Sequence, residues 1–296
     1  MVERAPIWAG LTPEEHEYQY NPQKSVPNFA ALRAQRDAPN AAARARLKSH
    51  LDIAFGEHAL DTLDVFPAAR DKAPVHVFIH GGYWRAQDKQ NFAFLAEPLV
   101  ARGICTVIIN YALCPAVTLD GVVDSAQRGF EWVVRNIARF GGDPERISLS
   151  GHSAGAHLGS AIMATDWAAR GIAADCLKAA VLISGIYDPS PAQHTSVNAE
   201  IRLTPEIIAR HNYEKHPPRR LCPTWIIAGG REPWQFIDQS FRYAHHLRRC
   251  GGDPAVIVSP GFNHFDILDQ YLDETSELMR AIIAASAAPS KTGAAS

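Results

Sequence analysis

The stretch that decides the fold is Arg146-Ile147-Ser148-Leu149-Ser150-Gly151-His152-Ser153-Ala154-Gly155-Ala156-His157-Leu158-Gly159. Its apolar start at 147–149 predicts a buried strand, and the small and apolar residues at its end predict a packed helix. The Gly-x-Ser-x-Gly between them is typical of a nucleophile elbow in this strand–turn–helix context. A serine on so sharp a turn has strained backbone angles, and glycines two positions away on either side remove collisions with the strand and the helix. We therefore predict that Ser153 is a nucleophile, against the alternative of a merely tight turn.

The composition is that of an ordinary globular protein. The chain has 296 residues, of which 47% are hydrophobic and 20% charged, so it can bury a sizeable core. The formal net charge of −2 and the absence of a basic cluster argue against a nucleic-acid partner. No apolar run reaches the length of a membrane span and no signal-peptide pattern opens the chain. Five cysteines without a Cys-x-x-Cys pair fit reduced thiols, so we expect a cytoplasmic protein.

Apolar runs of strand length alternate with helical patterns along the chain. The predicted strands are 50–54 and 62–66, which form a hairpin, and then 75–79, 104–110, 147–149, 179–183, 224–228 and 255–258. The predicted helices are 29–36, 41–50, 91–102, 119–137, the segment after Ser153, 236–249 and a closing amphipathic helix over 267–282. This alternation predicts an α/β fold with a mostly parallel central sheet and helices on both faces.

We expect one catalytic domain with two additions. Residues 51–286 form the domain, and residues 1–50 form an N-terminal segment that covers the site. Residues 188–221 break the alternation with a long stretch that holds five prolines. Loops of this length often act as lids, so we place this stretch over the site as a small cap. Residues 287–296 are small and polar, which predicts a disordered tail.

The serine needs a base, and the base needs an acid to orient it. In this arrangement both partners follow the serine along the chain, at the carboxyl ends of later strands. His264 lies in the loop after the last predicted strand and is the predicted base, although the chain has thirteen histidines and this one could be a solvated loop residue. Glu232 follows strand 224–228 and is the predicted acid. Asp188 and Asp238 are rivals, and each of the three could instead be a surface charge or a helix cap.

Two backbone segments are expected to stabilise the oxyanion. One donor is the N–H of Ala154, the residue after the serine. The others come from Gly81 and Gly82, in the loop that follows strand 75–79, because glycine lets the backbone approach a substrate closely. The alternative is a plain Gly-Gly turn. We expect His80 to brace this loop.

Aromatic side chains near these motifs are predicted to line a substrate pocket, although each could equally belong to the core. They are Tyr83, Trp84, Trp234 and Phe236. His152 and His157 are expected to support the site or to pack. No metal-binding pattern, phosphate loop or dinucleotide fingerprint occurs, so we expect no metal and no cofactor. The expected partner is a small-molecule substrate, without nucleic acid or membrane, and a homodimer is left open.

These motifs together resemble the α/β-hydrolases of the kynurenine formamidase (arylformamidase) group, close to the hormone-sensitive-lipase-like esterases. Four stretches carry most of the resemblance: His80-Gly81-Gly82-Tyr83-Trp84, Gly151-His152-Ser153-Ala154-Gly155, Ser184-Gly185-Ile186-Tyr187-Asp188 with Thr195-Ser196-Val197-Asn198, and Asn263-His264-Phe265-Asp266. The early Tyr20-Asn21-Pro22 with Val26-Pro27 is also similar, so the resemblance covers roughly residues 18 to 284.

The resemblance implies the α/β-hydrolase fold and hydrolysis of an N-formyl or small ester bond through an acyl-enzyme. It implies Ser153 as nucleophile, His264 as base and then acid, and Gly82 and Ala154 as oxyanion donors. Two features depart from the family's pattern: the acid, usually Asp, is Glu232, and the cap continues through residues 211–218, where the family more often has a shorter ending.

Three functions stay in comparison at this point. The first is an arylformamidase that acts on an N-formyl aromatic amine such as N-formylkynurenine, the family's substrate in tryptophan catabolism. The second is a carboxylesterase that acts on small acyl esters in another catabolic pathway, with the same residues. The third is a binding protein without turnover, which the loss of the serine, the histidine or the acid would favour. None of these three residues is missing.

Overall fold

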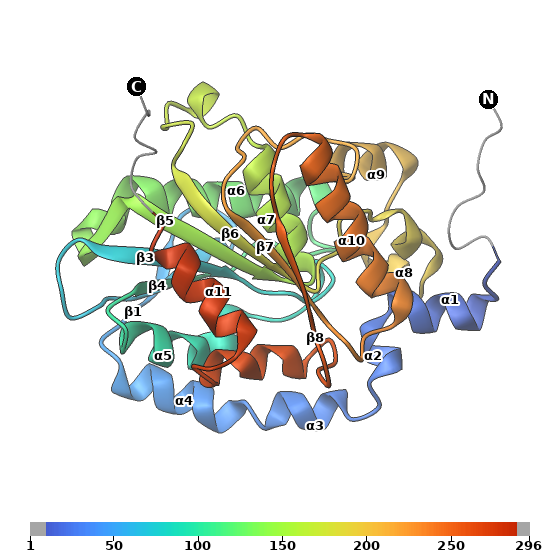
Figure 1. The fold of residues 1–296 in the computed structure, drawn as a ribbon, viewed down its shortest axis with the longest axis horizontal. Coiled ribbons are helices and arrows are strands. Elements are labelled where there is room, and N and C mark those ends of the chain that lie inside the picture. The colour runs from blue at the N-terminus through green and yellow to red at the C-terminus, as the bar shows by residue number, and fades with distance from the viewer. Residues whose placement is uncertain (1–9, 289–296) are drawn as a thin grey trace.

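A mostly parallel sheet of eight strands crosses the centre of the computed structural model, which describes residues 10–288 (Figure 1). Its order is β1-β2-β4-β3-β5-β6-β7-β8. The pairs β1–β2 and β2–β4 are antiparallel, and every other pair of neighbours is parallel. The predicted hairpin and parallel sheet are thus confirmed. The strands are β1 (His50–Ala54), β2 (Thr62–Phe66), β3 (Ala73–Ile79), β4 (Cys105–Ile109), β5 (Gly142–His152), β6 (Leu177–Ile183), β7 (Thr224–Gly229) and β8 (Ala255–Ser259).

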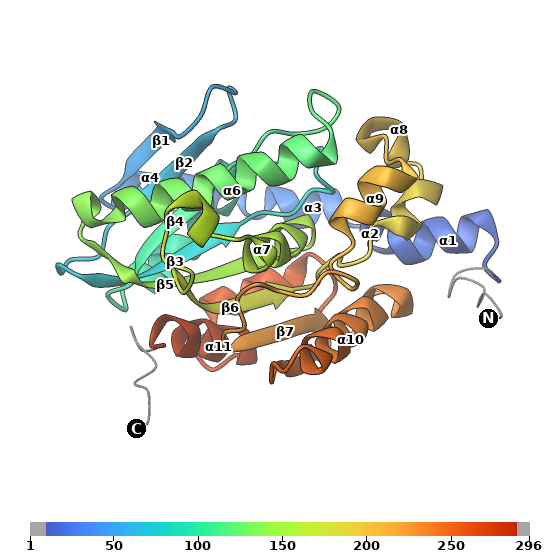
Figure 2. The same cartoon turned by 90° about the horizontal axis from the view of Figure 1, so that it is seen from above.

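Helices cover both faces of this sheet, as the sequence predicted (Figure 1; Figure 2). One face packs against α6 (Leu119–Asn136), α7 (Ala154–Ala164) and α10 (Trp234–Arg249). The other packs against α5 (Ala96–Val100) and α11 (Glu277–Ser286). Along β3, Val75 and Val77 face the first core while Phe78 faces the second, as the two-residue period of a strand requires. Within residues 10–288 no helix combines the length and the apolar character that crossing a membrane requires.

Short helices precede the sheet in the chain and also form the segment between β6 and β7. The N-terminal ones are α1 (Pro13–Tyr20), α2 (Pro22–Ser25), α3 (Phe29–Ala34) and α4 (Asp37–Arg46). The predicted cap contains a 3-10 helix (Ser190–His194), α8 (Asn198–Ile201) and α9 (Pro205–His211). Figure 2 shows α1 and α2 at the same end as α8 and α9. His16 Nε2 lies 2.8 Å from the Pro191 carbonyl, and Ser196 donates to Glu17, so the N-terminal segment and the cap are joined.

Three predicted helices differ from the structure for local reasons. The helix predicted at 91–102 is a 3-10 helix (Lys89–Leu95) followed by α5, which places Pro98 in a first turn where its missing N–H costs nothing. The closing helix is two pieces, a 3-10 helix (Asp266–Leu272) and α11, because Ser276 Oγ accepts from the Met279 N–H and starts a new helix. The helix predicted at 41–50 is α4, which ends before β1 begins.

Helix α1 is polar and the prediction missed it. Thr12 and Glu15 form a capping box around Pro13, a pattern that marks a helix start without any apolar period.

Most of the predicted tail lies outside the described residues, and the division into segment, domain and tail stays a prediction.

Backbone segments pack closely at the turn from β5 into α7. Ser153 has φ +57°, a region that a residue with a side chain rarely adopts. A Cβ atom on Gly151 would lie 2.2 Å from the Gly155 carbonyl oxygen, and one on Gly155 would lie 2.0 Å from the Ile79 carbonyl oxygen. The predicted need for glycine at both positions is confirmed.

We expect Gly155→Ala to destabilise the protein by about 3 kcal/mol or more, because its methyl group would meet backbone that cannot move aside. Gly159→Ala is the matched control in the same helix. Its Cβ would meet only the ends of the Leu182 and Leu149 side chains, so we expect a smaller loss. Thermal or denaturant unfolding measures both, and equal losses would contradict this account of the turn.

Candidate active site

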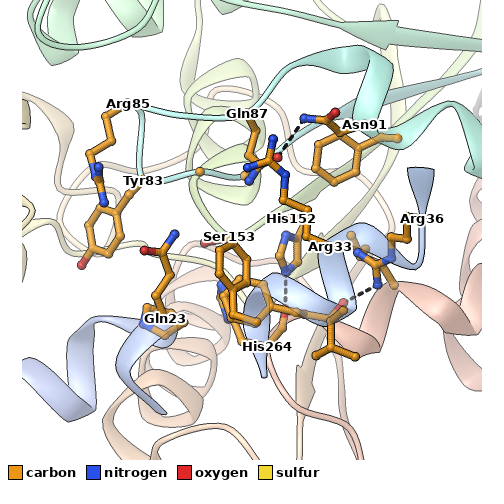
Figure 3. A pocket seen from close by; sticks show the side chains of 18 of the residues that line it. Gln23, Arg33, Arg36, Tyr83, Arg85, Gln87, Asn91, His152, Ser153 and His264 are labelled. Carbon is orange, nitrogen blue, oxygen red and sulfur yellow. Dashed lines mark hydrogen bonds between the residues drawn. The ribbon is translucent and has the colours of Figure 1, made fainter. Parts of the chain in front are cut away.

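Ser153 lies at the carboxyl end of β5, in the wall of a pocket that His264 also lines (Figure 3). The Ser153 backbone N–H donates to the Ile183 carbonyl at the end of β6, 2.8 Å away, which fixes the turn to the sheet. Ala154 is the first residue of α7, so its N–H has no acceptor within the helix. The serine is therefore held on a rigid turn with a free donor beside it.

His264 is oriented by a carboxylate. Its Nδ1 lies 2.8 Å from Glu232 Oε2, and both side chains are almost fully buried. The other carboxylate oxygen, Oε1, accepts from the Gly229 N–H and from Ser184 Oγ, each at 2.6 Å. Because buried carboxylates are costly unless they are hydrogen-bonded, these donors hold Glu232 in place. Since Nδ1 faces Glu232, Nε2 is the ring nitrogen of His264 that remains for chemistry.

The two rival carboxylates lie elsewhere. Asp188 accepts from Ser190 and from Asn212 Nδ2, and so stabilises the start of the cap. Asp238 is on α10, as predicted, and pairs with Arg242 one turn later. Of the three carboxylates considered from the sequence, Glu232 is the one placed on His264.

The loop after β3 lies against the serine. A Cβ atom on Gly81 would be 3.0 Å from Ser153 Cβ, and one on Gly82, where φ is +118°, would be 2.0 Å from the Ala86 carbonyl oxygen. Only glycine fits this path. The His80 ring braces the loop: its nitrogens lie 2.7 Å from the Gly81 carbonyl and 3.0 Å from Asn110 Oδ1, and it stacks on Tyr111.

Two further histidines surround the site. His152 lines the pocket, and its Nε2 lies 2.7 Å from the His264 carbonyl oxygen. Burial and the neighbouring His264 hold the pKa of His152 well below its usual range, so the ring is neutral and its Nε2–H can donate. His157 lies deeper, within 3.0 Å of the His211 carbonyl, and burial lowers its pKa to about 3. A lowered pKa makes each of these rings a weak base.

Of the four aromatic residues predicted to line the pocket, the structure places one there. Tyr83 lines the pocket, and its hydroxyl donates to the Tyr20 carbonyl 2.8 Å away. The other three predicted residues do not line the pocket, and the structure corrects their placement. Trp84 is fully buried against His157, with ring centroids 4.9 Å apart, and Phe236 packs edge-on against the His264 ring at 4.7 Å. Trp234 is 71% exposed on α10 and does not line the pocket.

The aromatic lining comes instead from residues that were not predicted to contact a substrate. Phe29 on α3 and Phe265 next to His264 lie with ring centroids 4.4 Å apart, and Phe92 and Leu268 also line the pocket. The N-terminal segment supplies much of the rest of the lining through Asn21, Pro22, Gln23, Leu32, Arg33, Arg36, Asp37 and Asn40. The three-to-four residue spacing from Phe29 to Asn40 was the available signal, since it gives a helical segment one continuous face.

Comparisons with known proteins agree with this architecture. Residues 76–267, more than half of the chain, match the family model described as alpha/beta hydrolase fold. The chain is 29% identical to a kynurenine formamidase of Danio rerio over 293 residues, which covers 93% of this chain and 97% of that protein. It is 35% identical over 225 residues to the esterase LipQ of Mycobacterium tuberculosis, covering 68% of this chain and 53% of LipQ.

Among solved structures, a protein provisionally called a thioesterase, from Silicibacter sp. TM1040, superposes with a TM-score of 0.78 at 23% identity. The match covers 90% of this chain and 97% of that one. At this identity the likeness shows the fold.

We expect Ser184→Ala to lower kcat/KM about tenfold, because Glu232 loses one of its buried charge-assisted hydrogen bonds and orients His264 less firmly. Ser240→Ala is the control: Ser240 Oγ is equally buried but has no hydrogen-bond partner among the described residues. Steady-state kinetics on any turned-over ester or formamide measures both variants. Equal kinetics for the two would show that the Ser184 contact does not matter.

Proposed function

Because the chain belongs to the α/β-hydrolase fold family, we propose that it is a serine hydrolase that cleaves an N-formyl aromatic amine, with N-formylkynurenine as the model substrate. The observation that supports the chemistry most directly is the His264–Glu232 pair at 2.8 Å, since His264 lines the same pocket as Ser153. Serine, imidazole and carboxylate in this arrangement are the parts that acyl transfer needs.

The proposed reaction passes through a formyl-enzyme. Ser153 Oγ attacks the formyl carbon while its proton moves to His264 Nε2. The oxygen that becomes negative accepts from the N–H groups of Gly82 and Ala154. The C–N bond then breaks, and His264 returns the proton to the leaving amine. Water attacks the formyl ester with His264 as base again, which releases formate and regenerates Ser153.

Two observations favour an aromatic formamide over other acyl substrates. The pocket beside Ser153 is lined by the rings of Phe29, Tyr83, Phe92 and Phe265, which suit an aryl leaving group. The second observation is the similarity to kynurenine formamidases over nearly the whole chain. The alternative is a carboxylesterase for small acyl esters, which the similarity to LipQ supports. The same residues would serve both, so substrates have to separate them.

We expect Ser153→Ala to reduce kcat by on the order of 10⁴-fold or more, because no other nucleophile replaces the hydroxyl. Circular dichroism and the unfolding midpoint should stay close to those of the parent protein, which shows that the fold is intact. A folded Ser153→Ala protein with substantial residual turnover would contradict the assignment of the nucleophile.

The substrate is tested by kcat/KM for N-formylkynurenine and for a short-chain aryl ester on one preparation. We expect the formamide to reach the usual enzymatic range of about 10⁴ M⁻¹s⁻¹ or more. Turnover of the ester alone would retain the serine chemistry and favour the carboxylesterase. If a folded protein turns over neither substrate, the hypothesis of a binding protein without turnover would be favoured.

A further inference from the structure

His152 presents a hydrogen-bond acceptor to the Ser153 pocket. Its Nε2 lies 2.7 Å from the His264 carbonyl oxygen, so the ring proton is on Nε2 and Nδ1 keeps its lone pair. The residue lines the pocket although only 4% of its surface is exposed, and within residues 10–288 its Nδ1 has no hydrogen-bond partner. Buried polar atoms are normally hydrogen-bonded, so this lone pair is available to a partner on a bound molecule.

This Nδ1 atom lies close to the reacting groups. The point where a Cβ atom on Gly81 would lie is 3.1 Å from His152 Nδ1 and 3.0 Å from Ser153 Cβ, so both atoms border the same small space. Glycine at position 81 leaves that space open. The rings of His152 and His264 have centroids 4.8 Å apart, and Figure 3 shows the contact that joins the two residues. A group that leaves the carbon bound to Ser153 and takes a proton from His264 therefore lies near Nδ1.

An amide and an ester make different demands on this space. When the tetrahedral intermediate collapses, the leaving atom turns a lone pair toward His264 Nε2 to take its proton. The leaving oxygen of an ester carries no hydrogen. The nitrogen of a secondary amide also carries an N–H, which points away from His264 once the lone pair faces it. Inside a buried pocket an N–H without an acceptor raises the energy of the transition state.

We propose that His152 is a specificity-determining residue whose Nδ1 accepts a hydrogen bond from the scissile N–H of a formamide. In this step the C–N bond breaks and its electron pair stays on the nitrogen, while the oxyanion re-forms the carbonyl of the formyl-Ser153 ester. The proton of His264 Nε2 moves to the nitrogen, and the original N–H hydrogen remains there, so the arylamine leaves with two hydrogens. The hydrogen bond to His152 stabilises this transition state for an amide and has no counterpart for an ester.

This inference rests on the formamidase function proposed above and adds to it the residue that separates formamides from esters. The test measures the amide preference, which is kcat/KM for a formamide divided by kcat/KM for phenyl formate. The formamides are N-formylkynurenine and formanilide, which has the same formyl group and ring as phenyl formate. Because the preference is a ratio within one preparation, differences in stability between variants cancel.

Two substitutions separate the two contacts of His152. His152→Gln removes the acceptor at Nδ1 and keeps an N–H donor for the His264 carbonyl. We expect it to lower the amide preference about tenfold, mainly through kcat for the formamide, with little change for the ester. His152→Asn does the reverse, because its Oδ1 lies near the former Nδ1 while the contact with His264 is lost. We expect it to lower kcat/KM for both kinds of substrate and to retain more of the amide preference than His152→Gln does.

His157→Gln is the matched control. His157 is a second buried histidine, its Nε2 also lies near a backbone carbonyl oxygen, that of His211 at 3.0 Å, and its Nδ1 has no hydrogen-bond partner among the described residues. His157 differs in that it does not line the pocket. Its amide preference should therefore equal that of the parent protein.

An equal amide preference in His152→Gln and His157→Gln, with a parent protein that cleaves a formamide, would overturn the inference and leave the formamidase proposal standing. A loss in His152→Gln that is the same for formamide and ester would also overturn it, because His152 would then act only by supporting His264. If the parent protein cleaves phenyl formate and neither formamide, the formamidase proposal fails and this inference fails with it.

Discussion

The contact between the backbone of α7 and the end of β3 is the constraint on which the site depends. With no side chain at Gly155, the first turn of α7 lies directly on the Ile79 carbonyl. This closeness brings the loop after β3 to the serine, since Gly81 follows Ile79 by two residues and its Cα faces Ser153. A larger residue at 155 would push apart the two segments from which the proposed oxyanion donors come. The absence of a side chain at residue 155 is thus needed both for the packing of α7 on the sheet and for the geometry of the site.

The buried carboxylate of Glu232 is also held in place by the fold before any substrate binds. Burying a charge is unfavourable unless its hydrogen bonds are complete, and here three donors surround it before any substrate arrives. Glutamate has a longer side chain than the aspartate usual in the family, and the turn from Gly229 to Glu232 folds back so that the carboxylate accepts from the Gly229 N–H. The chain accommodates the extra methylene by folding the acid against its own strand end, and the carboxylate still meets the imidazole.

Much of the fold and the core of the site could be predicted from the sequence, because the signals are local. The strand–Gly-x-Ser-x-Gly–helix pattern, the glycines and the alternation of strands and helices each lie within a short stretch. The pocket wall could not be predicted, because it depends on how distant segments pack. Trp84 follows Tyr83 directly, yet Trp84 turns into the core while Tyr83 faces the pocket, and both have positive φ. Phe29 reaches Phe265 across more than two hundred residues, and no periodicity reports such a meeting.

Two parts of the chain form the pocket, the carboxyl ends of the strands and the N-terminal helices. The proposed catalytic side chains lie at the carboxyl ends of the strands, whereas many other lining residues come from residues 21–40. That segment is held by contacts such as Tyr83 to Tyr20 and Arg36 to Phe265. Substitutions in that segment can change which molecule is accepted without touching the machinery that cleaves it. A short N-terminal stretch can thus vary in sequence while the proposed catalytic residues stay in place.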